Sequence, residues 1–398
     1  MNVQPLPSPL MTSKPGSFAR KTIVERKPQI IRQVMADNDY PPEILRALRD
    51  FATEIVAEPI QPLKEEAPDA EAWNEVWARY KGGGWLEVPW YFAEAYFYRR
   101  LLEAVCYFQP GKWRGCDPFA RQKEVQLADC LPRIGLAVEA LGRIQEDGIQ
   151  CEAWLHASLW GNRADLSNLT VSEEVRGRQG LVERENLLID DAQQVIELLQ
   201  QHSFRRVAFI NDNVGIELGF DLCLADFLLG HGWAERVTFH LKRDPFFVSD
   251  AMCKDVQATL KAFSASTIPK LAVLGRRLTQ ALAEGSLSLE ADPFWTTAFH
   301  FAEMSPQLRE TLAATDLVIS KGDVNYRRLL SDRHWPFTIP TEGVLDYFPT
   351  SLLILRTLKG EILTGVEEGV AERIAAEDPD WLLNGQRGLI QLVEGDQT

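Results

Sequence analysis

The chain has 398 residues, 45% of them hydrophobic and 25% charged, which is the composition of a folded globular protein. Its formal net charge of -15 repels phosphate backbones and anionic lipid surfaces, and this argues against a nucleic-acid partner or a membrane partner. The N-terminal segment lacks the apolar stretch of a signal peptide, and no run approaches the roughly 18 apolar residues of a membrane span. We therefore expect a cytoplasmic protein.

The cysteines and histidines do not form a recognisable cluster. None of the 6 cysteines belongs to a Cys-x-x-Cys pair, and the 6 histidines are scattered along the chain. This spacing argues against a zinc cluster and against a disulfide framework. We expect most of the cysteines to be small buried hydrophobes in a reducing compartment.

The expected organisation is a tail followed by two larger units. A loose tail rich in Pro and Ser is expected at 1–18, a helical subdomain at 19–150 and an α/β domain at 151–398. In the helical subdomain, apolar residues recur at helical spacing, and Pro132 is expected to separate two helical segments. The segments with this spacing are 41–60, 70–80, 91–108 and 127–147.

Short β-rich runs alternate with amphipathic stretches after about residue 150. Each run begins polar, continues apolar for several residues and then meets polar residues or glycine. This alternation predicts an α/β fold, a three-layer α/β/α domain with a mostly parallel sheet covered on both faces. The predicted strands are 206–211, 236–241, 316–321 and 351–356, and the helices between them include 189–201, 220–230 and 366–377.

Acidic and amide side chains follow the first two predicted strands. Ligands of open α/β sheets bind beyond the carboxyl ends of the strands, so these positions carry the most information. Asp212 and Asn213 end the first strand, with Glu217 close behind, and Asp250 follows the second. Their oxygen atoms suit a divalent cation such as Mg²⁺ or Mn²⁺. Taken singly, each is better explained as a turn residue or a helix cap.

Cationic side chains follow the other two predicted strands. Lys321 precedes a glycine that allows close backbone approach, Arg327 lies six residues further on, and Lys359 follows the last strand. Together they suggest an anion-binding cradle, although any one of them could be an ordinary surface cation. Carboxylates for a metal and cations for an anion are the ingredients of phosphoryl transfer. The motifs of serine hydrolases, Walker nucleotidases, zinc proteases and dinucleotide-binding folds are absent.

At these residues the sequence resembles the damage-control phosphatase family, specifically its acidic-residue methyltransferase-like branch. The resemblance spans nearly the whole chain from about residue 20, and its motifs agree in order and spacing. The Arg-Thr-x-Lys string from Arg356 to Lys359 is a marker of that branch. The matching stretches are PWYFAEAYFYRRL (89–101), LWGNRADLS (159–167), FINDNVGIELGFDLCLADFLL (209–229), FHLKRDPFFVSD (239–250), SKGDVNYRRL (320–329) and LRTLKGE (355–361).

The resemblance implies an α/β/α domain with an N-terminal helical subdomain and one divalent ion, Mn, Mg, Co or Ni. It implies that Asp212, Asn213 and Asp250 hold the metal, and that small phosphorylated metabolites such as sugar phosphates are hydrolysed. The residues implied to line the substrate pocket are Glu217, Asp323, Val324, Asn325, Tyr326, Arg327 and Lys359. Val324 stands where leucine is common in the family.

Two further groups of residues have open interpretations. Asn162 and Asp165 could orient substrate hydroxyls or water, and a turn that closes a strand is an equal alternative. The aromatic run from Trp90 to Tyr98 is more typical of a helix-bundle core than of a ligand site.

Three functions remain as hypotheses at this stage. The first is a metal-dependent phosphatase acting on phosphomonoesters of small metabolites, with Asp212 and Asp250 as catalytic residues; Asp212 as a nucleophile and direct attack by water both stay open. The second is an S-adenosylmethionine-dependent protein carboxyl methyltransferase, which lacks the expected glycine-rich loop. The third is a non-catalytic module that binds a phosphometabolite. The sequence makes no prediction of the oligomeric state.

Overall fold

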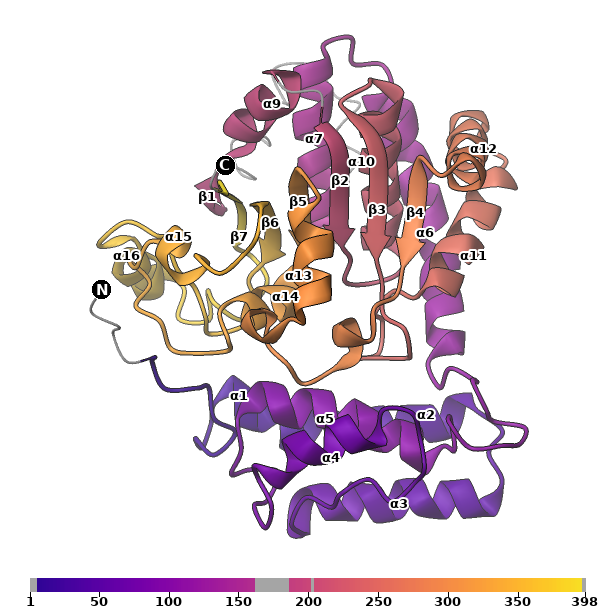
Figure 1. Cartoon of the computed structure of the whole chain (residues 1–398), viewed down its shortest axis with the longest axis vertical. Coiled ribbons are helices and arrows are strands. Elements are labelled where there is room, and N and C mark those ends of the chain that lie inside the picture. Colours follow the sequence, from indigo (N-terminus) through magenta and orange to yellow (C-terminus); the bar gives the residue numbers. More distant parts are fainter. Residues whose placement is uncertain (1–5, 162–185, 202–203, 396–398) are drawn as a thin grey trace.

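The structure, a computed structural model, describes residues 6–161, 186–201 and 204–395. A 7-stranded sheet with helices on both faces stands over a separate layer of N-terminal helices, shown in indigo and purple in Figure 1. The strands β2 and β3 point toward that layer, so their carboxyl ends face it (Figure 1). The three-layer α/β/α architecture predicted from the sequence is confirmed.

The sheet is mixed but mostly parallel. Its strand order is β1-β7-β6-β5-β2-β3-β4, and only β6 and β7 pair antiparallel among these neighbours. The chain extends the sheet in one direction from β2 through β3 and β4, and in the other through β5 and β6. The bounds are β1 Leu187–Asp190, β2 Phe204–Ile210, β3 Ala234–His240, β4 Leu287–Glu290, β5 Leu317–Lys321, β6 Ser351–Thr357 and β7 Gly388–Val393.

Alternate residues of the central strands are buried in different hydrophobic cores. In β2, Val207 and Phe209 join the core on one face, whereas Ala208 and Ile210 join the core on the other. Because successive side chains of a strand point to opposite faces, a strand covered on both sides must be apolar throughout. This explains why the central strands read as continuous apolar runs.

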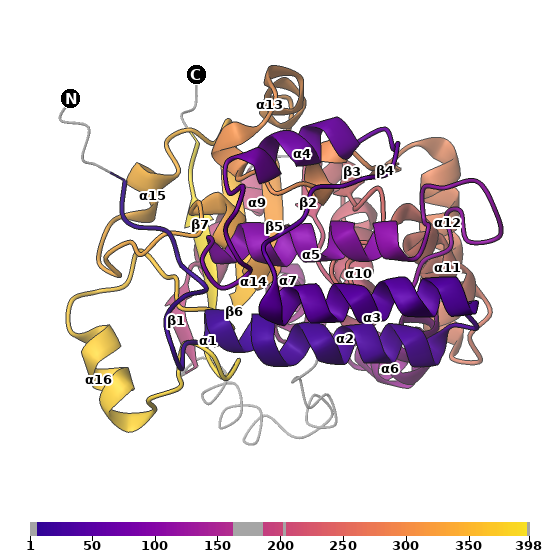
Figure 2. The same ribbon diagram turned by 90° about the horizontal axis from the view of Figure 1, so that it is seen from below.

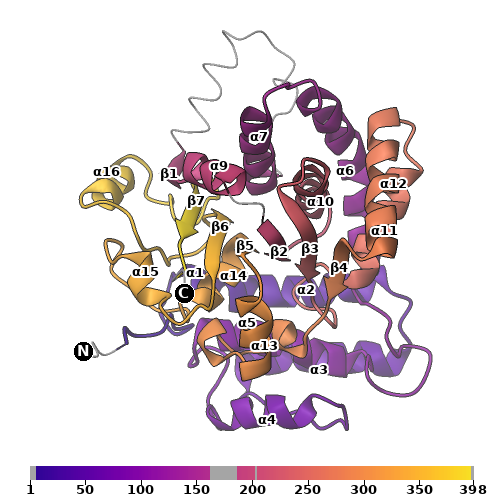
Figure 3. The same cartoon turned by 45° about the horizontal axis from the view of Figure 1, so that its top comes forward.

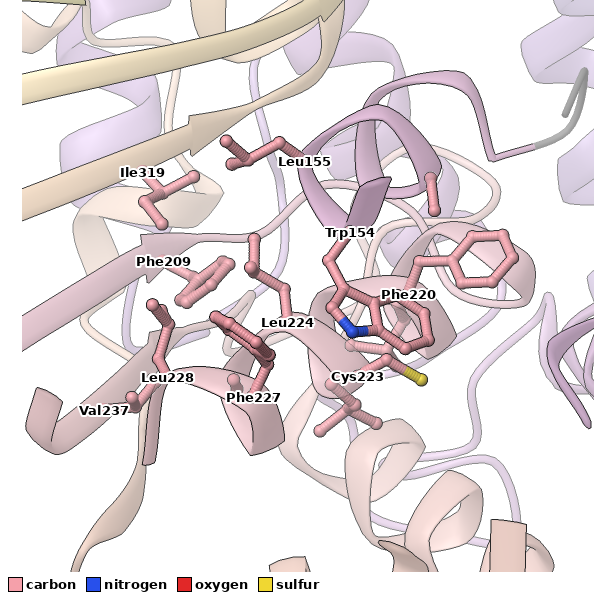
Figure 4. Close-up of a cluster of buried hydrophobic side chains, with 14 of the residues drawn as sticks. Trp154, Leu155, Phe209, Phe220, Cys223, Leu224, Phe227, Leu228, Val237 and Ile319 are labelled. Atoms are coloured by element: carbon pink, nitrogen blue, oxygen red, sulfur yellow. The ribbon is translucent and has the colours of Figure 1, made fainter. Parts of the chain in front are cut away.

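Two sets of helices cover the sheet, with α7 and α10 on one face and α13 and α14 on the other (Figure 3). Figure 4 shows Phe227 of α10 beside Phe209 of β2, and Trp154 of α7 beside Phe220 of α10. The first set is α6 Ala120–Leu141, α7 Asp147–Trp160, α9 Ala192–Gln201, α10 Ile216–Gly230, α11 Cys253–Ser264 and α12 Pro269–Glu284. The second is α13 Pro306–Ala313, α14 Gly322–Leu329, α15 Thr341–Val344 and α16 Val370–Glu377, with 3-10 turns at Pro293–Thr296 and Phe301–Glu303.

The N-terminal helices have their own aromatic core. Seen from below, α2, α3 and α5 run side by side (Figure 2). Trp90, Tyr91, Tyr96 and Tyr98 of α5 are all buried in this core, as the sequence interpretation favoured. The bounds are α1 Phe18–Lys21, a π-helical turn Thr22–Arg26, α2 Lys27–Asp37, α3 Pro42–Ala57, α4 Ala70–Ala78 and α5 Trp90–Ala104.

The helix α6 corrects one sequence prediction. We expected Pro132 to interrupt the segment, but α6 continues through it as one helix of 22 residues. Pro132 is exposed, so water can bond the carbonyl that its missing N–H leaves free. Cys130 on one side of the proline and Ile134 on the other are buried in the same core, and this packing holds both halves in line.

The first described residues contact both layers. Leu10 is 2% exposed; its N–H donates to Asp332 O at 2.8 Å, and its carbonyl accepts from Trp90 N–H at 2.7 Å. Thr12 N–H donates to Val88 O at 3.1 Å. The segment expected to be loose is therefore held by backbone hydrogen bonds at these positions. The division of the chain into a tail and two domains stays a prediction.

The cysteines differ in their surroundings. Cys130, Cys151 and Cys223 are buried, and burial raises the pKa of each of these thiols. Cys106 and Cys253 are half-buried, and Cys116 is exposed. Among the helices that the structure describes, none combines the length and the apolarity needed to cross a bilayer.

Candidate active site

A cavity of about 520 Å³ lies between the carboxyl end of the sheet and the N-terminal helices. It lies beside the point where the strand order reverses between β2 and β5, which is where ligands of open α/β sheets bind. The structure brings the following predicted site residues to its wall: Asp212, Asn213, Glu217, Asp250, Lys321, Asp323, Val324 and Lys359.

Backbone pairing holds the first two strand ends together. Asn213 and Asp250 form an isolated antiparallel bridge. Ala251 N–H donates to Asp212 O at 2.8 Å, and Val214 N–H donates to the carbonyl of Ser249 at 2.7 Å. These bonds do not depend on the acidic side chains, so the backbone itself fixes where the two carboxylates meet.

The amide of Asn213 links the acidic side chains. Its Nδ2 donates to Asp212 Oδ2 at 2.8 Å and to Glu217 Oε2 at 3.1 Å. Its Oδ1 accepts from the Ser249 hydroxyl at 2.6 Å, which fixes the orientation of the amide. A carbonyl oxygen has two lone pairs, so Oδ1 retains one for a further partner.

Burial and mutual repulsion make these carboxylates poor acids. Burial and the charge of Asp250 raise the pKa of Asp212 to about 7. Burial and the charge of Asp212 likewise raise the pKa of Glu217 to about 7. Burial raises the pKa of Asp250 to about 6, although Lys242 and Lys123 lower it. A bound cation would offset this repulsion, because an opposite charge at close range favours the ionised carboxylate.

The donor set fits a hard divalent cation. Asp250 Oδ2 is buried without a hydrogen-bond partner, and its nearest cation, Lys242 Nζ, lies 3.4 Å away. Two carboxylates and an amide oxygen are ligands that Mg²⁺ and Mn²⁺ accept. Among the residues that the structure describes, no three His, Cys, Asp or Glu side chains are gathered as a metal cluster, and the third ligand predicted from the sequence is the amide oxygen of Asn213.

Gly322 allows the ends of β2 and β5 to approach each other. A Cβ atom at this position would lie 1.9 Å from Asp212 Oδ2, closer than any real contact. Gly322 also has φ +84°, a left-handed conformation that glycine adopts without strain. The glycine in the Lys-Gly-Asp string therefore leaves the space that the Asp212 carboxylate occupies against the backbone of residue 322.

Lys321 lines the cavity, but its ammonium group is engaged. Nζ donates to Ser158 O at 2.6 Å and to Ser158 Oγ at 2.7 Å, and it lies 3.2 Å from Asp221 Oδ1. Three partners account for the three donors of an ammonium group. In this arrangement Lys321 connects β5 to α7 and α10. Lys359 is exposed and is therefore better placed to contact a substrate anion.

Asp323 is held by two arginines. Arg327 Nε donates to Oδ2 at 3.0 Å, and Arg356 Nε donates to Oδ1 at 2.8 Å. Burial opposes ionisation of Asp323, but the Arg356 and Arg327 charges lower its pKa to about 2. Oδ1 also accepts from Lys359 N–H at 3.2 Å, so this ionised carboxylate positions the loop that carries Lys359.

Three of the residues predicted to bind substrate face away from the cavity wall. Asn325 donates to Lys321 O at 2.8 Å, and Tyr326 packs under the Arg356 guanidinium, 4.0 Å from the ring centroid. Arg327 is fully buried over the Trp90 ring at 3.9 Å, with Nη1 3.0 Å from Asp332 Oδ1. Because these residues belong to helix α14, consecutive side chains point in different directions, and only Asp323 and Val324 of this run line the cavity.

Removal of Arg356 should destabilise the fold. The Arg356→Leu substitution leaves the half-buried Asp323 with only Arg327 as a cationic partner, and it removes the hydrogen bonds from the fully buried Arg356 to the carbonyls of Gly360 and Ile362. We expect a loss of about 3–5 kcal/mol of unfolding free energy. The measurement is denaturant unfolding followed by fluorescence. Arg236→Leu, which replaces an exposed arginine of β3, is the control and should change stability by no more than about 0.5 kcal/mol. Equal stabilities of the two variants would contradict the role given to Arg356.

Sequence reasoning missed the contribution of the N-terminal helices and of α6. Arg26, Trp90 and Glu94 line the cavity from the helical layer. One face of α6 also lines it, with Lys123 beneath, whose Nζ donates to Asp250 O at 2.8 Å. The cavity residues on that face follow helical spacing, and they are Gln126, Asp129, Cys130 and Arg133. Asn162 and Asp165, also predicted to bind substrate, lie outside the described residues.

Comparison with known proteins agrees with this architecture. Residues 22–374 match the damage-control phosphatase ARMT1-like domain. The chain belongs to this family. It is similar to damage-control phosphatase ARMT1 of Danio rerio, with 32% identity that covers 97% of this chain and 96% of the relative. The Mus musculus protein of the same name is 31% identical, with 97% of this chain and 98% of the relative covered.

A solved structure supports the fold. A DUF89 family protein from Pyrococcus horikoshii superposes with a TM-score of 0.50 over 94% of this chain and 96% of its own, at 14% identity. Membership of the damage-control phosphatase family indicates that the chain is a phosphatase, and therefore a hydrolase. The family also implies a small phosphorylated metabolite as substrate.

Proposed function

We propose that the chain is a metal-dependent phosphomonoesterase of small metabolites, with sugar phosphates as the substrate class and Mn, Mg, Co or Ni as the metal. The observation that carries this proposal is the convergence of Asp212, Asn213 and Asp250 on one cavity wall, beside the exposed cation Lys359. Oxygen ligands for a metal and a free cation for a phosphate thus come together in a molecule whose net charge is -15.

Each residue of this wall has a separate task in the proposal. Asp212, Asn213 and Asp250 would hold the divalent ion, which would supply a Lewis acid for a phosphate oxygen and for the charge that develops in the transition state. Lys359 binds the remaining phosphate oxygens as a charged donor. Ser249 holds the Asn213 amide in a fixed orientation, and Glu217, which shares that amide, orients the attacking group or a substrate hydroxyl.

The cavity favours a small substrate. A volume of about 520 Å³ falls within the range of about 300–1,000 Å³ that is usual for small-molecule sites. Besides its acidic side chains, the cavity is lined by half-buried apolar side chains, among them Phe18, Phe247 and Val324. A sugar phosphate has matching parts, since its carbon-bound hydrogens form an apolar face while its phosphate and hydroxyl groups are polar.

A substrate panel tests the proposal. Purified protein is incubated with sugar phosphates and each of the four metals, and released phosphate is measured. We expect phosphate release that needs added metal and stops with a chelator. Binding of sugar phosphates without any release would instead support the non-catalytic module, and no binding and no release with any metal would overturn the proposal.

Replacement of Lys359 should weaken substrate binding more than it slows the chemical step. Loss of a charge-assisted hydrogen bond in Lys359→Ala costs about 1.5–3 kcal/mol, which appears mainly as a higher KM. Michaelis kinetics with the best substrate measure the effect. Lys261→Ala removes an exposed lysine of α11 outside the cavity and serves as the matched control. A KM that is the same in both variants would remove Lys359 from the substrate site.

A further inference from the structure

The π-helical turn Thr22–Arg26 lies between α1 and α2 at the cavity wall. Such turns are rare, and they are frequent at functional sites. The turn ends at Arg26, and the next residue, Lys27, begins α2, so two cations are adjacent in the chain but have different surroundings. Lys27 is fully buried in an ion pair with Glu94, with Nζ 4.6 and 4.5 Å from the ring centroids of Phe97 and Tyr98. Arg26 instead is exposed and lines the cavity.

The guanidinium of Arg26 has no protein partner in the described parts of the chain, where neither a hydrogen bond nor an ion pair holds it. Glu94, which lines the cavity from the helical layer, is already paired with Lys27. The other cavity arginine, Arg133 of α6, donates to Gly161 O at 3.3 Å. Arg26 therefore presents an unmatched positive charge to whatever occupies the cavity.

Arg26 and Lys359 line the cavity from different parts of the fold. Lys359 belongs to the loop after β6, and its charge acts on Asp212 at the sheet end of the cavity. Arg26 belongs to the helical layer, where its charge lowers the pKa of the buried Tyr98 phenol while the charge of Glu94 raises it. In the part of the chain that the structure describes, each of the two layers that enclose the cavity thus contributes an exposed cation, Lys359 from the loop after β6 and Arg26 from the helical layer.

We propose that Arg26 binds a second anionic group of the substrate, a carboxylate or a second phosphate, at the end remote from the ester that is cleaved. The inference rests on the proposed phosphatase function and narrows its substrate class to small phosphometabolites with two anionic ends. A guanidinium suits either group, because its planar fork donates two parallel hydrogen bonds to a carboxylate or a phosphate. A substitution at Arg26 should therefore alter specificity and not the chemical step.

Matched substrates test this specificity. Phosphate release is measured for a hexose 6-phosphate, a hexose 1,6-bisphosphate and the 6-phosphate of a sugar acid. We expect the wild-type kcat/KM to be higher by about tenfold or more for the two doubly anionic compounds. In Arg26→Ala this advantage should fall below about threefold, through KM, while the rate with the hexose 6-phosphate changes by less than about twofold. Comparison of the bisphosphate with the sugar-acid phosphate shows whether Arg26 prefers a phosphate or a carboxylate.

Two variants keep the test independent of folding. Arg26→Gln retains most of the side chain without its charge and should behave like Arg26→Ala. Arg32→Ala removes an exposed arginine of α2 that does not line the cavity, and it should keep the full wild-type preference. Equal preference in wild type and Arg26→Gln, or no preference in the wild type, would overturn the inference.

Calorimetric titration separates this inference from the proposed function. If the wild type releases phosphate from all three compounds without preference, the phosphatase proposal stands and the role of Arg26 is wrong. If it releases none, but binds the doubly anionic compounds more tightly than the hexose 6-phosphate and loses this difference in Arg26→Gln, the site stands without the phosphatase proposal. If neither turnover nor a difference in binding is seen, both are overturned.

Discussion

Replacement of Asp212 by alanine should abolish phosphate release while the fold persists. One of the three proposed metal ligands is lost, and we expect kcat/KM to fall by at least about 10³-fold. The strand ends stay in place, because Ala251 N–H bonds the Asp212 backbone carbonyl and not its side chain. Stability without metal should be unchanged or higher, since a buried carboxylate that is repelled by Asp250 has been removed.

Three measurements check the Asp212→Ala expectation. Phosphate release gives the activity, calorimetric titration with Mn²⁺ gives the metal affinity, and thermal unfolding without metal gives the stability. Asp50→Ala, which removes an exposed aspartate in the middle of α3, is the control and should match the wild type in all three. Retained Mn²⁺ affinity in Asp212→Ala would show that the proposed ligand set is wrong.

Replacement of Gly322 by alanine should also inactivate the protein, but for a steric reason. The left-handed backbone at φ +84° costs a side chain about 1–2 kcal/mol. The added methyl would in addition lie 1.9 Å from Asp212 Oδ2, so either the carboxylate or the β5–α14 turn must move. A displacement of about 1 Å at a reacting group lowers a rate by about 10²-fold. Activity should therefore fall far more than stability.

A second glycine separates the two costs of Gly322→Ala. Gly285 follows α12 with φ +81°, and a Cβ atom added there would have no neighbour within 4 Å, so Gly285→Ala carries only the backbone cost. Both variants should lose similar stability from the backbone term in thermal unfolding. Only Gly322→Ala should lose activity and Mn²⁺ affinity. Full activity in Gly322→Ala would show that position 322, beside the Asp212 carboxylate, tolerates a side chain.

The sequence was most informative where structure depends on near neighbours. The predicted strands 206–211, 236–241, 316–321 and 351–356 correspond to β2, β3, β5 and β6, because their continuous apolar runs reflect burial on both faces. The strands β1 and β4, of 4 residues each, were missed, since such short runs carry too little periodicity to recognise. The last strand, β7, was also missed.

The sequence also indicated part of the set of residues that line the cavity. Asp212, Asn213, Asp250 and Lys359 were noticed because each follows a predicted strand, and the structure places all of them at one cavity. The residues from Asn325 to Arg327 were also predicted to bind substrate, but their side chains are buried in the protein and do not line the cavity. A sequence position shows that a residue follows a strand, but the direction of its side chain depends on where α14 begins, at Gly322.

By itself the sequence determined the layered α/β/α fold and the acidic and cationic groups at the strand ends, since apolar periodicity and the residues after a strand are local properties of the chain. Only the tertiary structure decided the strand order, the inward turn of Arg327, and the approach of Arg26 and Glu94 to the cavity. Those depend on how the N-terminal helices pack against the end of the sheet, a contact between segments far apart in the chain whose energy no local pattern records.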